Sequence, residues 1–172
     1  MPDDNRSASA ASAPALEDAI ALAALAHRGQ GYPTAALRRE PFILHPLRVL
    51  LRLDTDVERI VAVLHDLVED TAYTVDDLHR IGYPDEVLAA VNCLTRRGDE
   101  HYDTYIDRVA GHPVARRVKL ADLADNLAHN RDVDSLAEER ARAERYEQAR
   151  ARLFAADAAD ARRAMQADSG QA

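Results

Sequence analysis

Residues 57–71 read VERIVAVLHDLVEDT, and the apolar character of this stretch decides the expected fold. Its apolar residues fall almost all the way round a helix, at Ile60, Val61, Val63, Leu64 and Leu67. A surface helix is apolar on one face only, whereas a helix that is apolar on every side belongs in the middle of a bundle. The stretch therefore predicts a central, buried helix.

Helical patterns also fill the sequence on both sides of this stretch, and we expect helices over residues 15–29, 46–53, 74–82, 84–94, 102–110, 113–130 and 135–165. Thr74 and Asp77 have the spacing of a capping box, and Gly82 is placed to end the helix that they begin. No segment shows the sustained alternation of apolar and polar residues that indicates a half-buried strand. The predicted fold is all-α.

The length of 172 residues suits one domain with one hydrophobic core. Residues 1–14, rich in Ala and Ser, are expected to be a disordered segment, residues 15–166 the folded domain and residues 167–172 a disordered tail. A formal net charge of −8 argues against a protein that grips nucleic acid by its phosphates. No apolar run approaches the roughly 20 residues that cross a bilayer, so we expect no membrane association and a cytoplasmic location.

Three short motifs carry the polar residues that stand out against these apolar helices. They are LHP at 44–46, LHDLVEDT at 64–71 and VKLADLADN at 118–126. Glu69 follows His65 by four residues, and Asp70 follows Asp66 by four, so each pair shares one face if the helix continues that far. Asp122 has the same relation to Asn126 in a helix that is otherwise rich in leucine, where a bare carboxylate is costly to bury.

Two imidazoles and two carboxylates, from His45, His65, Asp66 and Asp122, form a mixed nitrogen and oxygen set. Such a set suits manganese, iron, zinc or cobalt and leaves positions open for water and substrate. Taken singly, the same residues also fit a surface His–Asp pair, a helix cap and a solvated aspartate. The residues alone leave the metal site and these structural interpretations both open.

Four segments in order resemble the hydrolase domain of the RelA/SpoT homologue family: AHRGQ (26–30), EPFILHPLRV (40–49), AVLHDLVEDT (62–71) and VKLADLADN (118–126). The stand-alone small alarmone hydrolases are the most similar in size. The resemblance implies an HD-domain helical bundle that hydrolyses the 3′-pyrophosphate of (p)ppGpp to GDP or GTP and pyrophosphate. It implies one divalent metal, Mn²⁺, and hydrolysis without synthesis, because too few residues remain for a synthetase domain.

The resemblance also assigns roles to residues. It implies that the metal ligands are His45, His65, Asp66 and Asp122. It implies that Glu69 and Asp70 position or activate the attacking water, and that Asn126, Arg142 and Tyr146 contact the nucleotide. Arg39 and Lys119 are further candidates for pairing with phosphate, since both carry positive charge beside these motifs; Lys119 is also placed to pair with Asp122.

Two segments depart from the family pattern and leave the substrate open. The loop at 31–40, GYPTAALRRE, is longer than the family's loop. The segment at 94–113, LTRRGDEHYDTYIDRVAGHP, differs from the sequence that is usual in the family. One alternative keeps the site but changes the substrate to (p)ppApp, to the 2′-phosphate of NADPH or to another phosphorylated nucleotide. A second alternative is a non-catalytic nucleotide-binding regulatory module, against which the intact set of acidic and imidazole residues counts.

Overall fold

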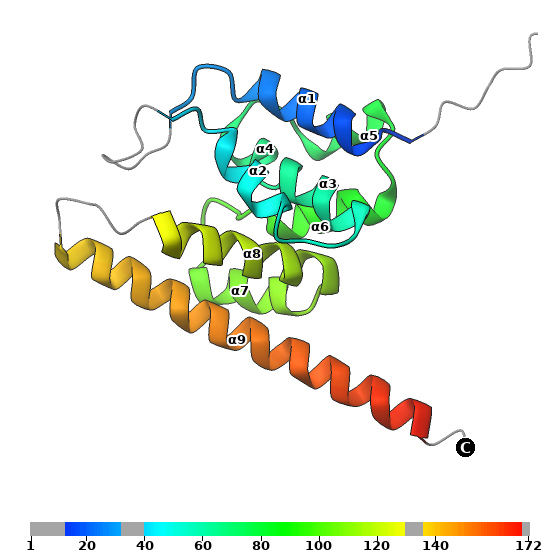
Figure 1. Ribbon diagram of the computed structural model, residues 1–172, viewed down its shortest axis with the longest axis vertical. Helices are drawn as coiled ribbons and strands as arrows, with labels where there is room; N and C mark the ends of the chain where they lie inside the picture. Colours follow the sequence, from blue (N-terminus) through cyan, green and yellow to red (C-terminus); the bar gives the residue numbers. More distant parts are fainter. Residues whose placement is uncertain (1–12, 32–39, 130–135, 170–172) are drawn as a thin grey trace, which may run out of the picture.

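The computed structural model describes residues 13–31, 40–129 and 136–169. Helices account for most of this part of the chain (Figure 1). They are α1 (Leu16–Ala26), α2 (Leu44–Leu50), α3 (Asp56–Leu64), α4 (Leu67–Asp70), α5 (Val75–Ile81), α6 (Asp85–Leu94), α7 (Tyr102–Ala110), α8 (Pro113–His129) and α9 (Leu136–Ser169). The described residues contain no strand, only an isolated bridge between Gly31 and Pro41. The predicted all-α fold is confirmed.

Helix α3 is the centre of the bundle, as its sequence predicts. It packs against α1, α2, α6 and α8. Its residues from Val61 to Leu64 have no exposed surface, and Ile60 is also buried. Thr55 caps the start of the helix, where its Oγ1 accepts a hydrogen bond from the Glu58 amide at 3.3 Å. His45 lies on α2 and Asp122 lies on α8, and both of these helices pack against α3.

Helix α9 covers the outer side of α7 and α8 (Figure 1). Ala149 and Leu153 are the residues of α9 that are buried in the core. Arg116 of α8 is 3% exposed and pairs with Asp157 at 3.1 Å and Asp160 at 2.6 Å, which adds an ionic link between the two helices. Beyond this link the C-terminal end of α9 extends past the rest of the bundle (Figure 1).

The expected capping box at the start of α5 is confirmed. Thr74 Oγ1 accepts a hydrogen bond from the Asp77 amide, and the Asp77 carboxylate accepts one from the Thr74 amide. Gly82 ends the helix with φ of +106°, a left-handed conformation that glycine adopts without the steric cost of a side chain. The local pattern was sufficient here because all three residues act within one short helix.

The structure corrects several of the expected boundaries: α1 ends at Ala26 and not at residue 29, and α2 spans Leu44–Leu50 where residues 46–53 were expected. The central helix was expected to run through Leu67, but α3 ends at Leu64 and the helix resumes as α4 after a turn at His65 and Asp66. The tail was expected to begin at residue 167, but α9 continues to Ser169. The predicted disordered residues 1–12 and 170–172 lie outside the described part. None of the described helices combines the length and the apolar run needed to span a membrane.

Candidate metal centre

Four side chains from three parts of the chain converge beside the end of α3. His45 is the second residue of α2, His65 and Asp66 form the turn between α3 and α4, and Asp122 lies in the middle of α8. His45, His65 and Asp122 are 2–4% exposed, while the Asp66 side chain is 22% exposed. The structure therefore brings together the residues that the sequence motifs separate by up to 77 positions, from His45 to Asp122.

The distances between these side chains match those between ligands of one metal ion. His45 Nε2 lies 3.1 Å from Asp122 Oδ1 and 3.6 Å from Asp66 Oδ2. His65 Nε2 lies 3.1 Å from Asp66 Oδ1 and 3.8 Å from Asp122 Oδ1. Ligands at about 2.1 Å from a common ion are separated from one another by roughly 3 to 4 Å. One atom from each of His45, His65 and Asp122 lies within 4.8 Å of the other two.

The donor set also fits a cation chemically. His65 Nε2 is fully buried and makes no hydrogen bond of acceptable geometry, although a carboxylate oxygen lies 3.1 Å away. The other ring nitrogen, Nδ1, lies 2.6 Å from the carbonyl oxygen of Ala62, to which it donates a hydrogen bond. With Nδ1 engaged in this bond, Nε2 is the ring nitrogen that faces the carboxylates, and it is the nitrogen that a neutral imidazole can offer to a metal. The buried His/Asp group can bind a divalent metal ion.

The nearby carboxylates shift the pKa values of the two imidazoles. Burial lowers the pKa of His45, but hydrogen bonds to Asp122 and Asp125 outweigh burial and raise the pKa to about 10. Burial likewise lowers the pKa of His65, and the charges of Asp66 and Asp122 raise it above the ordinary histidine value. A group of carboxylates that draws protons onto nearby imidazoles attracts a divalent cation in the same way.

Asp122 is held by two further side chains of α8. Lys119 Nζ lies 2.7 Å from Asp122 Oδ2, and Asn126 Nδ2 donates a hydrogen bond of 2.6 Å to Oδ1. Burial raises the pKa of Asp122, but the charge of Lys119, the hydrogen bond from His45 and the nearby His65 ring hold it well below the ordinary value. The predicted pairing of Lys119 with Asp122 is present, so the positive charge of Lys119 is directed at a candidate ligand.

Glu69 and Asp70 lie on α4, immediately beyond the turn that carries His65 and Asp66. Both side chains are exposed, and the Asp70 amide donates a hydrogen bond of 2.8 Å to the Asp66 carbonyl, which keeps the expected four-residue relation. Glu69 Oε2 accepts a hydrogen bond of 3.2 Å from the Arg96 amide. Asp70 is exposed as a residue, but its carboxyl group is partly desolvated, and this desolvation, followed by the charges of Asp66 and Glu69, raises its pKa. A carboxyl group with a raised pKa is suited to proton transfer.

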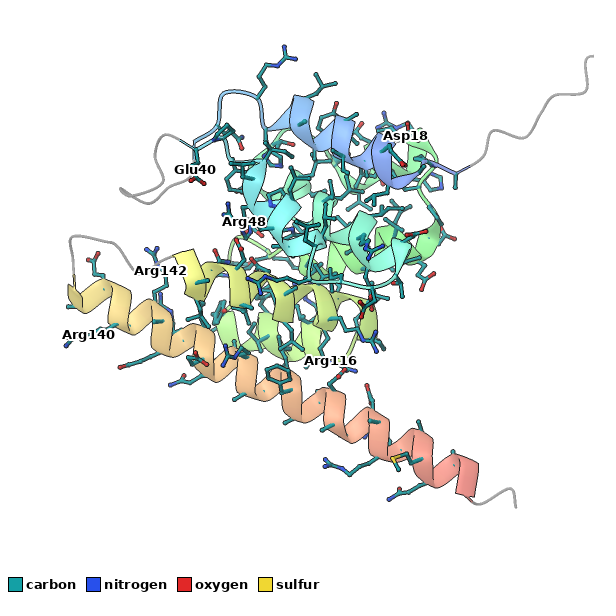
Figure 2. All side chains as sticks on the ribbon, in the orientation of Figure 1. Asp18, Glu40, Arg48, Arg116, Arg140 and Arg142 are labelled. Carbon is teal, nitrogen blue, oxygen red and sulfur yellow. The ribbon has the colours of Figure 1, made fainter. Side chains whose placement is uncertain are left out.

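The remaining predicted substrate contacts lie on α9 or outside the described residues. Tyr146 packs against the core, and burial raises its pKa, with the charge of Lys119 opposing the shift. Arg142 lies one turn before it and projects toward the C-terminal end of α8 (Figure 2). Both therefore lie on the side of α9 that faces Asp122 and Lys119. Arg39 lies in the segment 32–39, which is outside the described part of the chain.

The motifs did not single out two buried polar groups next to the site. Asp125 is fully buried and binds His45 and Arg48. His27 is 2% exposed, and its Nδ1 lies 2.7 Å from Oε1 of Gln30, whose amide donates to the carbonyl of Asp70. The signal for Asp125 was present in the sequence, since an acidic residue three positions after Asp122 falls on nearly the same face of an apolar helix.

Comparison with known proteins shows which proteins this chain resembles. No protein-family model matches the chain. The guanosine-3′,5′-bis(diphosphate) 3′-pyrophosphohydrolase of Aquifex aeolicus is 36% identical over 101 residues, which are 51% of this chain and 14% of that protein. A GTP pyrophosphokinase of Streptomyces coelicolor is 32% identical over 135 residues, or 73% of this chain and 15% of that protein. The predicted resemblance to the RelA/SpoT homologue family is confirmed.

A solved structure supports the RelA/SpoT-type fold independently. The structure, reported as "A metazoan ortholog of SpoT hydrolyzes ppGpp and plays a role in starvation responses", matches with a TM-score of 0.69 at 23% identity, over 83% of this chain and 88% of that chain. The likeness shows that the two chains share the same all-α fold. This RelA/SpoT-like chain spans only about a seventh of the length of the two curated relatives, at 14% and 15%.

Proposed function

We propose that this protein is a metal-dependent phosphohydrolase that removes the 3′-pyrophosphate of (p)ppGpp. The observation that carries the proposal is that His45, His65 and Asp122 each place one ligand atom within 4.8 Å of the others, while Asp66 lies 3.1 to 3.6 Å from the two imidazoles. Glu69 and Asp70 follow on α4, and two exposed carboxylates next to a buried His/Asp group suit a reaction site better than a structural charge cluster.

The four converging side chains would hold one divalent metal, which we propose to be Mn²⁺ because imidazole nitrogen and carboxylate oxygen together suit that ion. When bound, the metal supplies Lewis-acid chemistry, polarising a phosphoryl oxygen and making water a better nucleophile. Lys119 and Asn126 hold the Asp122 carboxylate in place, so that the ligand does not reorganise during the reaction.

Glu69 and Asp70 carry the proton transfer in this proposal. Water attacks the phosphorus that is bonded to the ribose 3′ oxygen, and the P–O3′ bond breaks. The raised pKa of Asp70 allows this carboxylate to take the proton of the water. The ribose 3′ oxygen receives a proton, and the products are pyrophosphate and GDP or GTP. Glu69 orients the water from the neighbouring position on α4.

Asn126, Arg142, Tyr146, Lys119 and Arg39 are the proposed contacts for the nucleotide. Tyr146 lies on α9, which packs against α8, and is close enough to Lys119 and Asp122 to feel their charges, while Arg142 lies one turn before it. A guanidinium group pairs well with a phosphate, and a tyrosine ring offers a surface for a base or a ribose.

The names of the relatives agree with hydrolysis. The Aquifex aeolicus relative is a guanosine-3′,5′-bis(diphosphate) 3′-pyrophosphohydrolase, and the metazoan SpoT ortholog hydrolyses ppGpp. The Streptomyces coelicolor relative has a different activity in its name, GTP pyrophosphokinase, and this chain corresponds to 15% of that protein. We therefore infer hydrolysis from the site and do not infer synthesis.

The test is a substrate panel. The full chain with Mn²⁺ is incubated with ppGpp, pppGpp, ppApp and NADPH, and products are resolved by ion exchange. We expect GDP and pyrophosphate from ppGpp. Inorganic phosphate from NADPH, with ppGpp unchanged, would overturn the proposed substrate. A sample that binds Mn²⁺ but turns over none of these nucleotides would support the regulatory module instead. Asp66→Ala serves as the inactive control, and Asp56→Ala, whose side chain is 85% exposed, as the surface control.

A further inference from the structure

Asp125 is a fully buried carboxylate beside the candidate metal ligands, and the resemblance assigns it no role. It lies on α8, three residues after Asp122, and has no exposed surface. Its Oδ2 lies 2.9 Å from His45 Nδ1, while Arg48 Nε donates to Oδ1 at 3.0 Å and to Oδ2 at 3.1 Å. Burial raises the pKa of Asp125, but the hydrogen bonds from His45 and Arg48 lower it below the ordinary value.

The bond from Asp125 determines which nitrogen of His45 is available to a metal. An imidazole has two nitrogens, and a carboxylate at one of them accepts the N–H there. With Nδ1–H donated to Asp125, Nε2 is the nitrogen that can present a lone pair. Nε2 is also the atom that lies 3.1 Å from Asp122 Oδ1 and 3.6 Å from Asp66 Oδ2. The same bond fixes the rotation of the ring.

The two candidate histidine ligands differ in how they are oriented. His65 Nδ1 donates to the backbone carbonyl of Ala62, so a side-chain substitution cannot remove that bond. At His45, by contrast, Nδ1 is bound by a side-chain carboxylate, that of Asp125, and Arg48 binds the same carboxylate from the next turn of α2. Figure 2 shows Arg48 beside α2, at the end of the bundle where Glu40 also lies. Glu40 is 3.6 Å from Arg48 Nη1 and extends the chain of charges outward.

We propose that Asp125 is a positioning residue for the metal centre, which sets the tautomer and the ring orientation of His45, with Arg48 holding the Asp125 carboxylate in place. The inference rests on the proposed metal-dependent function. A purely structural ion pair between Asp125 and Arg48 would behave differently, because its loss would lower folding stability without changing the metal affinity of a folded variant.

The experiment compares Mn²⁺ binding to the full metal-free chain and to Asp125→Asn. Asparagine has the same shape and keeps one acceptor oxygen, but it loses the charge that binds both His45 and Arg48. Replacing such a partner of a metal ligand lowers metal affinity by about 10- to 100-fold. We expect a rise of that size in the Kd for Mn²⁺ measured by calorimetry, while circular dichroism shows a folded protein.

Glu58→Gln is the matched control. Glu58 is 5% exposed, pairs with Arg117 at 2.9 Å and uses both carboxylate oxygens, as Asp125 does. It lies seven residues before His65 on α3, about 10 Å along the helix. We expect this variant to lose stability but to keep the wild-type Kd for Mn²⁺. An equal loss of affinity in both variants, or an unchanged Kd in folded Asp125→Asn, would overturn the inference.

A second measurement uses the wild-type chain and so does not depend on how a variant folds. Nitrogen-15 NMR of the protein with the diamagnetic ion Zn²⁺ should show His45 protonated at Nδ1 and not at Nε2. The opposite tautomer contradicts the inference. A wild-type chain that binds neither Mn²⁺ nor Zn²⁺ contradicts the proposed function itself, whereas binding that is insensitive to Asp125 contradicts only the positioning role.

Discussion

At the scale of single residues, Asp122 shows how a carboxylate is kept charged in the core. Its two oxygens face His45 Nε2, Asn126 Nδ2 and Lys119 Nζ at distances between 2.6 and 3.1 Å. A carboxylate that is 2% exposed would otherwise be expensive to bury. Because positive or donor groups surround it from two helices, Asp122 stays ionised and fixed, which is the state in which it binds a metal without reorganising.

In the proposed mechanism the metal ligands bind Mn²⁺ and Glu69 of α4 orients the water, so Glu69→Gln should change the rate and not the metal affinity. Glutamine keeps an oxygen that can accept the Arg96 amide but has no negative charge. We expect the Kd for Mn²⁺ to stay unchanged and kcat for ppGpp to fall by about 100-fold or more, the usual contribution of a proton-transfer or water-orienting group. Calorimetry and steady-state kinetics on the same sample measure the two quantities.

The control for this substitution is Glu17→Gln, an exposed change on α1. Its kinetics should match those of the wild type. A Glu69→Gln variant that loses Mn²⁺ binding would assign Glu69 to the metal, and one with full activity would remove it from the reaction.

How far the sequence predicts this site depends on whether each residue has a local signal. His45, His65, Asp66 and Asp122 lie in short motifs next to apolar helices, and the structure brings them together. Asp125 also lies in one of these motifs, but its role does not follow from the motif, because its partner is 80 positions away and only tertiary packing brings the two together. The same is true of buried Glu58, whose partner Arg117 lies 59 positions away.

At the scale of helices, the presence of each helix was easier to predict than the residues at which it ends. The apolar pattern of the central stretch predicts a buried helix, and α3 is buried. The pattern cannot predict that this helix ends at Leu64, because His65 and Asp66 are compatible with helical geometry and keep α-region dihedral angles in the turn. The end of α9 at Ser169 was missed for a similar reason, since Ala-rich sequence continues a helix without an apolar stripe.

The capping box of α5 predicts a measurable loss in Thr74→Ala. The substitution removes the hydroxyl that accepts from the Asp77 amide. Loss of such a cap costs about 1 kcal/mol. Urea unfolding of the metal-free protein should show this decrease in the free energy of unfolding. Thr104→Ala, an exposed change within α7, should not lower it. Equal values for the two variants would show that the cap contributes nothing.

The ion pair between Glu100, which precedes α7, and Arg108 of α7 predicts a pH dependence of the free energy of unfolding. Glu100 binds Arg108 at 2.7 Å, and this hydrogen bond is the main cause that lowers the pKa of Glu100 from 4.5 to about 2. A carboxylate with a lowered pKa in the folded state adds stability that is present above its unfolded pKa and is lost as pH falls through the folded value. Wild-type protein should therefore lose this contribution between pH 4.5 and about 2.

Glu100→Gln isolates that contribution, because glutamine does not titrate. The wild type should be the more stable protein above pH 4.5, and the difference should shrink toward pH 2. Urea unfolding at a series of pH values measures it. A difference between the two proteins that stays constant across this range would show that the Glu100 carboxylate has the same pKa folded and unfolded.

At the scale of the whole molecule, the candidate metal centre joins parts of the bundle that are distant in sequence. Its ligands come from α2, from the turn after α3 and from α8, and α9 packs on the far side of α8. The carboxylates of Asp66 and Asp122 both lie beside the two imidazoles, and Lys119 compensates part of their charge. A bound cation should therefore stabilise the fold as a whole.

This coupling predicts a thermal shift on metal addition. A ligand that binds only the folded state at 100 times its Kd adds about 2.7 kcal/mol. For a chain of this size that corresponds to an increase in Tm of roughly 5 to 10 °C. Scanning calorimetry of the metal-free protein with added Mn²⁺ should show the increase, and chelation with EDTA should reverse it. Asp66→Ala should show no shift at the same Mn²⁺ concentration, because one ligand is missing, whereas Asp56→Ala should shift like the wild type. If Asp66→Ala shifts equally, Mn²⁺ acts at another site, and these four side chains are a charge cluster that the fold tolerates without a metal.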